Sequence, residues 1–79
     1  YYHLPGLSGV DLPMTALAEA ALARIPNFAG IKFSQPDLFA WQELRAGFGD
    51  RLDLFWGADE VLLAAAALGA TTAVGSTYN

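Results

Sequence analysis

The sequence predicts an α/β fold in which parallel strands alternate with outer helices, as in part of a (β/α)8 (TIM) barrel. Apolar runs of strand length alternate with segments whose apolar residues recur at helical spacing, and the links between them are short. This alternation predicts a parallel sheet, because consecutive parallel strands need a crossover, which is usually a helix. Residues that could carry chemistry fall at the carboxyl ends of strands, where barrel active sites are built. A whole barrel takes about 250 residues, so this chain would form less than half of one.

The first part of the chain is expected to form the end of a strand, a loop, a helix and a second strand. Residues 1–3 are strand-like, and residues 4–9 are rich in turn-forming residues. Asp11 can cap the helix that follows, and Pro13 suits its first turn. Residues 28–34 then form the second strand. The apolar residues at helical spacing between these segments are Met14, Leu17, Ala18, Ala21, Leu22 and Ile25.

The second part repeats this pattern. Residues 34–37 open a second helix, residues 52–56 form a third strand and residues 61–68 form a third helix. Residues 71–75 are expected to be a fourth strand, followed by a loop at residues 76–79. The apolar stripe of the second helix consists of Leu38, Trp41 and Leu44. The glycines expected to end these elements are Gly47, Gly49, Gly57 and Gly69.

A doubly wound α/β sheet would show the same order of elements. No Gly-x-Gly-x-x-Gly phosphate loop follows any strand, which counts against the dinucleotide-binding version of that fold. The barrel also accounts for the placement of polar and small residues at strand ends. Those residues are Tyr2, Lys32, Ser34, Gly57, Asp59, Glu60 and Ser76.

Composition excludes several classes of function. The net charge is −4 and the three arginines are scattered, so we expect no nucleic acid and no membrane as partner. With no cysteine and one histidine, disulfides and thiolate metal sites are excluded, and we expect no metal. The longest apolar run, residues 61–68, is too short to span a bilayer, which favours a cytoplasmic protein. A start at Tyr1 and an apolar content of 54% indicate a fragment that packs against further chain.

Lys32 is the main indication of function. It is the only lysine in the chain and lies between Ile31 and Phe33 in a strand that otherwise reads as buried. Such a lysine must either extend its ammonium to water or lose part of its charge. A partly neutral lysine is a nucleophile that typically forms a Schiff base with a ketone or aldehyde. The alternative is an ordinary strand-end lysine whose amine reaches solvent.

Other strand-end residues also allow two interpretations. Tyr2 is either an acid-base residue or an aromatic residue that fills the top of the sheet. Asp59 and Glu60 either cap a helix or hold a polyhydroxylated substrate, because carboxylates accept hydrogen bonds from hydroxyls. For His3 a structural or surface role is favoured over one at the mouth of the site. Two further aromatic residues are expected to serve in packing, Trp41 and Trp56.

Four motifs together closely resemble the N-acetylneuraminate lyases, the sialic acid aldolases of the class I pyruvate-aldolase family that also contains dihydrodipicolinate synthase. They are Tyr2-His3-Leu4-Pro5 with Leu7-Ser8-Gly9-Val10, Gly30-Ile31-Lys32-Phe33-Ser34, Gly57-Ala58-Asp59-Glu60 and Gly75-Ser76-Thr77-Tyr78-Asn79. The resemblance implies that residues 1–79 run from the end of the fifth barrel strand through the eighth, within one larger catalytic domain. It also implies a homotetramer when the protein is full length. Gly6 departs from the alanine usual in that loop, and the loop that binds the substrate carboxylate would lie upstream.

The same resemblance assigns roles to individual residues. It makes Lys32 the Schiff-base lysine and Tyr2 the catalytic tyrosine, and it places Ser34 where a hydroxyl residue touches substrate. The positions that match those binding the hydroxyl and glycerol end of the sugar are Gly57, Asp59, Glu60 and Ser76. The implied reaction is reversible cleavage of N-acetylneuraminate to N-acetylmannosamine and pyruvate. It proceeds through a covalent lysine imine, with the C4 hydroxyl proton passing to Tyr2 directly or through the substrate carboxylate, and it needs no cofactor.

Two alternatives remain at this point. One is another pyruvate-dependent aldolase of the same family, either dihydrodipicolinate synthase-like or acting on a sugar acid. The Asp59–Glu60 pair together with Ser76 argues against it. The other is a non-catalytic truncated barrel that acts as an interaction module, which the presence of Lys32, Tyr2 and the Asp59–Glu60 pair together disfavours. The 79 residues alone are expected to be inactive, because half the sheet and the carboxylate-binding loop are missing.

Overall fold

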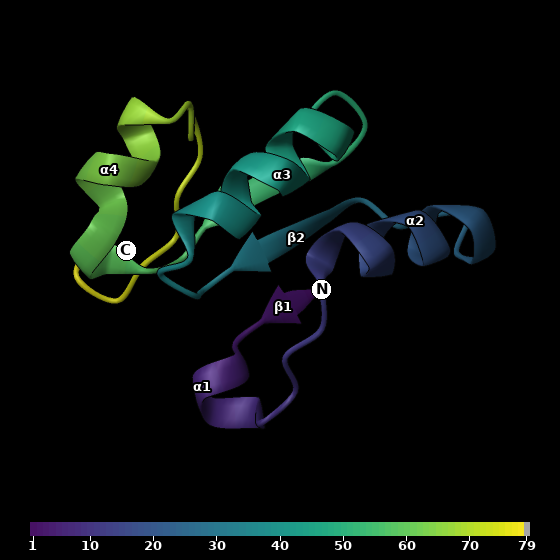
Figure 1. The fold of residues 1–79 in the computed structure, drawn as a ribbon, viewed down its shortest axis with the longest axis horizontal. Coiled ribbons are helices and arrows are strands. Elements are labelled where there is room, and N and C mark those ends of the chain that lie inside the picture. Colours follow the sequence, from purple (N-terminus) through teal and green to yellow (C-terminus); the bar gives the residue numbers. More distant parts are fainter. Residues whose placement is uncertain (79) are drawn as a thin grey trace.

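A computed structural model describes residues 1–78 as a three-stranded parallel sheet with helices between the strands. The strands are β1 (Tyr2–His3), β2 (Gly30–Phe33) and β3 (Asp53–Trp56), and their order in the sheet is β1-β2-β3. Both pairings are parallel, with Tyr2 opposite Lys32 and Lys32 opposite Phe55. The predicted parallel α/β arrangement is therefore confirmed (Figure 1).

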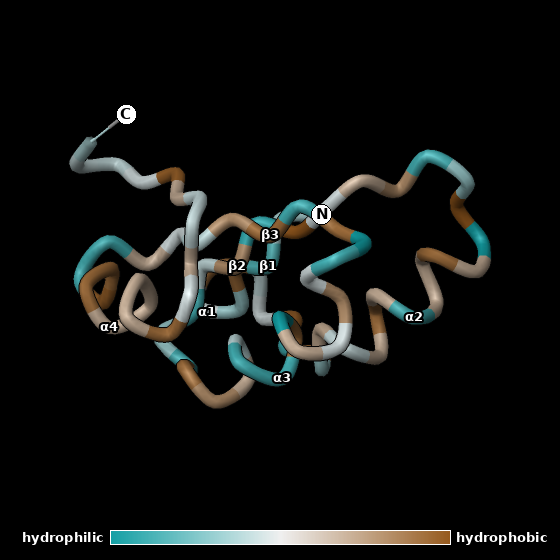
Figure 2. The backbone as a smooth tube through the Cα atoms, turned by 90° about the horizontal axis from the view of Figure 1, so that it is seen from above, coloured by the Kyte–Doolittle hydropathy of each residue, from teal (hydrophilic) through white to brown (hydrophobic). Residues whose placement is uncertain are grey.

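The larger helices cover one face of the sheet. The helices are α1 (Pro5–Ser8), α2 (Met14–Arg24), α3 (Leu38–Phe48), a 3-10 turn η1 (Asp59–Val61) and α4 (Leu62–Ala67). Figure 2 shows α2, α3 and α4 on the same side of the strands. The opposite face of the described sheet is left open. Within residues 1–78, no helix has both the length and the hydropathy that a bilayer-spanning segment requires.

The core lies between the sheet and these three helices. Trp41 of α3 and Trp56 of β3 are both fully buried, and their rings meet edge to face at 5.3 Å between centroids. Phe33 stacks on Trp56 at 5.8 Å. The expectation that both tryptophans serve in packing is confirmed. Because side chains alternate across a strand, burial of Ile31 and Phe33 on this face directs Lys32 to the open face.

The first long helix starts and ends differently from the prediction. Asp11 does not cap it: the cap position is Pro13, no side chain caps the helix, and Asp11 is exposed. Pro13 fixes the backbone at this point and its carbonyl accepts from the Leu17 amide at 3.1 Å, so α2 needs no aspartate to begin. Ile25 lies just beyond the helix and is 48% exposed, so its expected place in the apolar stripe was wrong.

The loop predicted at residues 4–9 contains the short helix α1. Pro5 suits its first position, and the Leu4 carbonyl accepts from the amides of Leu7 and Ser8. The second long helix begins where the sequence predicts, because the Asp37 carboxylate accepts from the Ala40 amide at 3.0 Å. It ends at Phe48 with Gly49 at its cap position, so the expectation that Gly47 ends it was wrong. An N-cap of this kind is readable from sequence, whereas a single turn of helix among turn residues is not.

The predicted fourth strand is reduced to one bridge between Trp56 and Ala73. The Trp56 amide donates to the Thr72 carbonyl at 2.9 Å, and the Val74 amide donates to the Trp56 carbonyl at 3.0 Å. Beyond this bridge no further strand pairing is described up to residue 78, and the Thr77 amide donates to the Asp59 carboxylate. The third helix also differs, since η1 precedes α4 and neither has a side-chain cap.

Candidate active site at the carboxyl ends of the strands

Tyr2 and Lys32 form the centre of the candidate site. They are partners in the register of β1 and β2 and share the open face of the sheet. The Lys32 Nζ atom lies 4.2 Å from the centroid of the Tyr2 ring. An ammonium in this position is attracted to the negative face of the ring. Tyr2 is 53% exposed among the described residues, so the pair is not buried in the core.

The charge of the lysine changes the acidity of the tyrosine. The nearby Lys32 side chain, and after it the Ser34 side chain, lower the pKa of the Tyr2 phenol below its usual value of 10.0. The positive charge of Lys32 acts in the same direction, while partial burial opposes it. A lowered pKa makes the phenolate easier to form near neutral pH, so Tyr2 is suited to exchange protons with a neighbour.

Gly57 and Ser34 complete the group around Lys32. The Gly57 amide donates to the Phe33 carbonyl at 2.8 Å, which brings the end of β3 against the end of β2. A β-carbon at Gly57 would collide with the Ser34 hydroxyl and would lie 3.0 Å from Lys32 Cε. Any larger residue at this position would require the Ser34 and Lys32 side chains to shift. The structure thus brings four of the sequence-predicted residues together at three strand ends: Tyr2, Lys32, Ser34 and Gly57.

Asp59 belongs to a second group, built with the segment that follows the Ala73 bridge. Its Oδ2 accepts from the Thr77 amide at 2.9 Å, and this bond is the main reason that the pKa of the Asp59 carboxyl lies below its usual value. Burial and the Asp59 charge raise the pKa of the nearby Tyr78 phenol. A β-carbon at Gly75 would collide with Asp59 Oδ1 and would lie 2.6 Å from Tyr78 Cζ. Asp59 therefore orders the loop 75–78.

Glu60 and Ser76 lie next to this second group and are exposed. Among residues 1–78, no hydrogen bond or ion pair joins either of them to Lys32. Asp59 and Glu60 occupy the first turn of η1, where no side chain caps an amide, so the capping interpretation of this pair was wrong. Asn79, the last residue of the fourth motif, lies outside the described residues.

Sequence reasoning missed the pairing of His3 with Gln35. His3 is 1% exposed and faces the helices, and its Nε2 donates to Gln35 Oε1 at 3.0 Å. The favoured structural role for His3 is in keeping with this burial. Alternation along residues 1–3 predicts that His3 faces away from Tyr2, but no local pattern indicates a partner 32 residues away.

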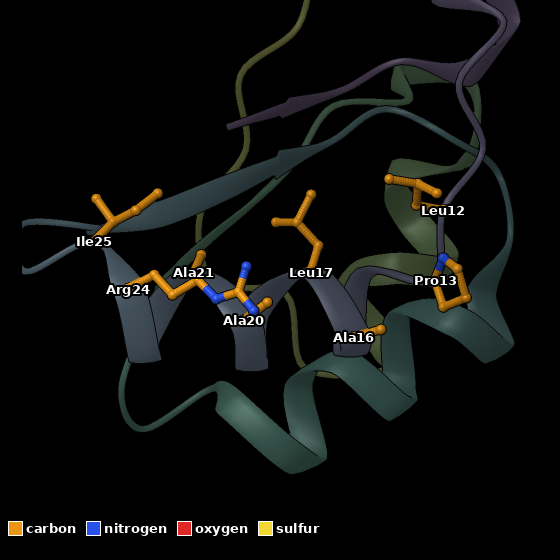
Figure 3. Close-up of a pocket in the computed structure, with 8 residues that line it drawn as sticks. All are labelled: Leu12, Pro13, Ala16, Leu17, Ala20, Ala21, Arg24 and Ile25. Carbon is orange, nitrogen blue, oxygen red and sulfur yellow. The ribbon is translucent and has the colours of Figure 1, made fainter.

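The most apolar groove of the described residues lies apart from the Tyr2–Lys32 pair. Figure 3 shows an apolar groove along α2, lined among others by Leu17, Arg24 and Ile25, and it shares no residue with the candidate site. A second hollow does touch the pair, because Lys32 lines it together with Tyr1 and Phe55. Within the described residues 1–78, no group of three His, Asp or Glu side chains is placed to bind a metal ion.

Comparisons with known proteins agree with this arrangement. A sequence model of the dihydrodipicolinate synthetase family matches residues 1–79. The N-acetylneuraminate lyase of Rattus norvegicus is 45% identical over 80 residues, which cover all of this chain and 25% of the relative. The N-acetylneuraminate lyase structure from Aliivibrio salmonicida superposes with a TM-score of 0.92 at 45% identity, over 99% of this chain and 26% of that one. The corresponding Proteus mirabilis structure gives a TM-score of 0.90 at 41% identity, with the same coverage.

These matches confirm both the resemblance drawn from the four motifs and the prediction that the chain forms a portion of a (β/α)8 barrel. The chain spans about a quarter of the length of the relatives it matches. The remaining three quarters of such a relative have no counterpart among these 79 residues.

Proposed function

Because this chain belongs to the dihydrodipicolinate synthetase family, we propose that the full-length protein is a Schiff-base aldolase that reversibly cleaves N-acetylneuraminate to N-acetylmannosamine and pyruvate. Relatives that are 40–45% identical carry the name N-acetylneuraminate lyase, which supports this substrate. The observation that carries the proposal is the placement of Lys32 Nζ 4.2 Å from the Tyr2 ring centroid. This pairing sets an amine nucleophile beside a proton-transfer residue.

In the first step, the neutral amine of Lys32 adds to the C2 ketone of open-chain N-acetylneuraminate. The resulting carbinolamine loses water, so that a protonated imine joins Lys32 Nζ to C2. Lys32 lowers the pKa of the Tyr2 phenol, which makes the phenolate that is required in the next step easier to form. No metal or organic cofactor takes part in this proposal, since the imine itself supplies the electron sink.

In the second step, Tyr2 accepts the proton of the C4 hydroxyl while the C3–C4 bond breaks. The electron pair of that bond moves into the iminium and gives an enamine, and C4 becomes the aldehyde of N-acetylmannosamine. Protonation of the enamine at C3 and hydrolysis of the imine then release pyruvate and restore the Lys32 amine. General acid–base catalysis of this kind contributes about 10²- to 10⁴-fold to the rate.

Residues near the second group are proposed to bind the sugar. Carboxylate and hydroxyl groups suit a polyhydroxylated substrate, and Asp59, Glu60 and Ser76 supply them. Asp59 also holds the loop 75–78 through the Thr77 amide, so the same carboxylate shapes the surface on which the sugar would lie. Ser34 and Gly57 border Lys32 and are proposed to contact the pyruvate-derived carbons.

The remaining parts of the proposal concern the whole protein. Residues 1–79 would supply the end of the fifth strand through the eighth strand of one catalytic domain. The family resemblance supports a homotetramer, and we propose a cytoplasmic location. The binding site for the substrate carboxylate would come from the rest of the barrel.

Trapping with borohydride tests the imine. The full-length protein is incubated with pyruvate and borohydride, and the modified peptide is identified by mass spectrometry. We expect a reduced pyruvyl adduct on Lys32, and none when Lys32 is replaced by arginine, which keeps the charge but is not a nucleophile at neutral pH. A folded protein that shows no adduct on Lys32 would remove the aldolase proposal.

A panel of aldehyde acceptors tests the substrate. Another pyruvate-dependent aldolase of the family would form the same adduct, because Tyr2 and Lys32 serve the pyruvate half of either reaction. With pyruvate as donor, we expect N-acetylmannosamine to be the preferred acceptor. Preference for a semialdehyde or an unrelated sugar aldehyde would replace the sialic acid assignment and keep the imine.

A further inference from the structure

The strand that carries Tyr2 has only two residues. Its backbone pairs with β2, and the bonds that flank the pairing include Lys32 N donating to Tyr1 O at 2.8 Å and Ser34 N donating to His3 O at 2.9 Å. Of the two strand residues, Tyr2 is 53% exposed and His3 is 1% exposed. The His3 side chain is therefore the part of β1 that is anchored in the core.

The His3 ring is held at two points. It packs on Phe33, with 5.2 Å between the ring centroids, and its Nε2 lies 3.0 Å from Gln35 Oε1. An amide oxygen can only accept a hydrogen bond, so the imidazole nitrogen carries the proton. In the neutral ring this leaves Nδ1 without a hydrogen, and Nδ1 has no hydrogen-bond partner among residues 1–78. The bond to Gln35 thus fixes both the ring and its tautomer.

We infer that His3 and Gln35 act as positioning residues that hold Tyr2 against Lys32, an inference that rests on the proposed aldolase function. Gln35 follows Ser34 in the chain, so its bond to His3 joins the segment bearing Tyr2 to the segment bearing Lys32 and Ser34. The bond lies on the helix side of the sheet and the reacting pair lies on the open side. His3 and Gln35 therefore act through the backbone of β1 and not by contact with substrate.

Variants of the full-length protein separate this role from simple packing. Gln35→Leu removes the acceptor at similar size, Gln35→Glu keeps an acceptor oxygen, and His3→Phe keeps a ring against Phe33 but removes the donor. Gln42→Leu is the matched control, because Gln42 is an exposed glutamine on α3. We expect Gln35→Leu and His3→Phe to lower kcat by about tenfold with little change in KM, since misplacement of a catalytic group costs rate.

The conservative and double variants sharpen the test. Gln35→Glu should keep kcat within about twofold of wild type because the hydrogen bond survives. His3→Phe combined with Gln35→Leu should be no slower than either single variant, because both remove the same bond. An unchanged kcat in Gln35→Leu, or an equal loss in Gln35→Glu, would overturn the inference. If His3→Phe fails to fold, Gln35→Leu decides the question, because Gln35 is only partly buried.

Crystal structures distinguish failure of this inference from failure of the proposed function. In Gln35→Leu we expect the Tyr2 ring to be displaced from Lys32 Nζ, and in Gln42→Leu we expect it to stay in place. A Tyr2 ring that does not move in Gln35→Leu would overturn the positioning role, whatever the activity. A wild-type protein without a pyruvyl adduct on Lys32 would refute the aldolase function, while the ring position would still decide the role of His3 and Gln35.

Discussion

Gly57 lies so close to Ser34 that a β-carbon at Gly57 would collide with the Ser34 hydroxyl. The same β-carbon would lie 3.0 Å from Cε of Lys32. The hydrogen bond from the Gly57 amide to the Phe33 carbonyl keeps the two strand ends at this spacing. The absence of a side chain at Gly57 is therefore part of the geometry of the candidate site.

Replacement of this glycine should affect the site more than the fold. We expect Gly57→Ala to slow trapping of the pyruvate imine by at least tenfold, because Ser34 and Lys32 must both shift to admit the methyl group. Gly47→Ala is the control: Gly47 lies in α3, and nothing is within 4 Å of its added β-carbon. Gly47→Ala should trap pyruvate like wild type and raise stability by up to about 1 kcal/mol. Equal trapping rates in both variants would show that the contact with Ser34 does not matter.

Removing the Tyr2 hydroxyl should separate the two chemical steps. Tyr2→Phe keeps a ring beside Lys32 and removes the group proposed to accept the C4 hydroxyl proton. We expect kcat for cleavage to fall by about 10²- to 10⁴-fold, the usual contribution of a general base. The borohydride-trapped adduct on Lys32 should still form, because the amine is intact. Undiminished cleavage by Tyr2→Phe would assign the proton transfer to another residue.

The acidity of Tyr2 should depend on the charge of Lys32. Lys32 lowers the pKa of the Tyr2 phenol, so Lys32→Met should raise that pKa toward 10. The phenolate absorbance is titrated with and without the Tyr2→Phe substitution, and the difference between the two curves is the signal of Tyr2 alone. In wild type this difference signal should rise at lower pH than in the Lys32→Met background. Identical titration curves in the two backgrounds would contradict the coupling of the two side chains.

Local patterns in the sequence were sufficient for much of the fold. Alternation of burial along residues 30–33 places Lys32 opposite the core, and the helical spacing of Trp41 and Leu44 buries both of them. The Asp37 cap could be predicted because its partner, Ala40, lies three residues away. The parallel topology then gathers the strand ends at one edge, which is why Tyr2 and Lys32 could be placed together in advance.

Features that depend on distant partners could not be predicted. The fourth strand is reduced to one bridge, and beyond it the Thr77 amide bonds to Asp59, 18 residues away. The His3 bond to Gln35 spans 32 residues. Composition and periodicity report on residues that are close in the sequence. They cannot predict a single hydrogen bond between side chains of two distant segments. The roles of Asp59, Glu60 and Ser76 toward substrate remain predictions.

The bond between Asp59 and Thr77 should make stability depend on pH. The pKa of the Asp59 carboxyl lies below 3.8 in the folded protein, so the charged form stabilises the fold above about pH 4. That contribution is lost as the pH falls through the folded-state pKa. The difference in Tm between wild type and Asp59→Asn should therefore be constant near neutral pH and shrink below about pH 4.

A control variant accounts for the loss of one negative charge. Glu43 is exposed on α3 and makes no hydrogen bond or ion pair among residues 1–78, so Glu43→Gln changes the net charge alone. We expect Glu43→Gln to leave the Tm near that of wild type throughout this range. A Tm difference for Asp59→Asn that grows on acidification would contradict the sign of the pKa shift.

Replacement of Gly75 should impair binding of the sugar and leave the reaction with pyruvate unchanged. A β-carbon there would collide with Asp59 Oδ1 and Tyr78, so Gly75→Ala must displace the loop 75–78 that Asp59 orders. We expect the KM for N-acetylneuraminate to rise by about tenfold or more, because the groups proposed to bind the sugar hydroxyls lie on this loop and beside it. Gly6→Ala is the control, since the space around Gly6 is open.

Both variants should form the pyruvyl adduct on Lys32 at the wild-type rate, because Tyr2 and Lys32 lie on other strands. Loss of the adduct in Gly75→Ala would show that the two groups act as one site, and an unchanged KM would exclude the loop from sugar binding.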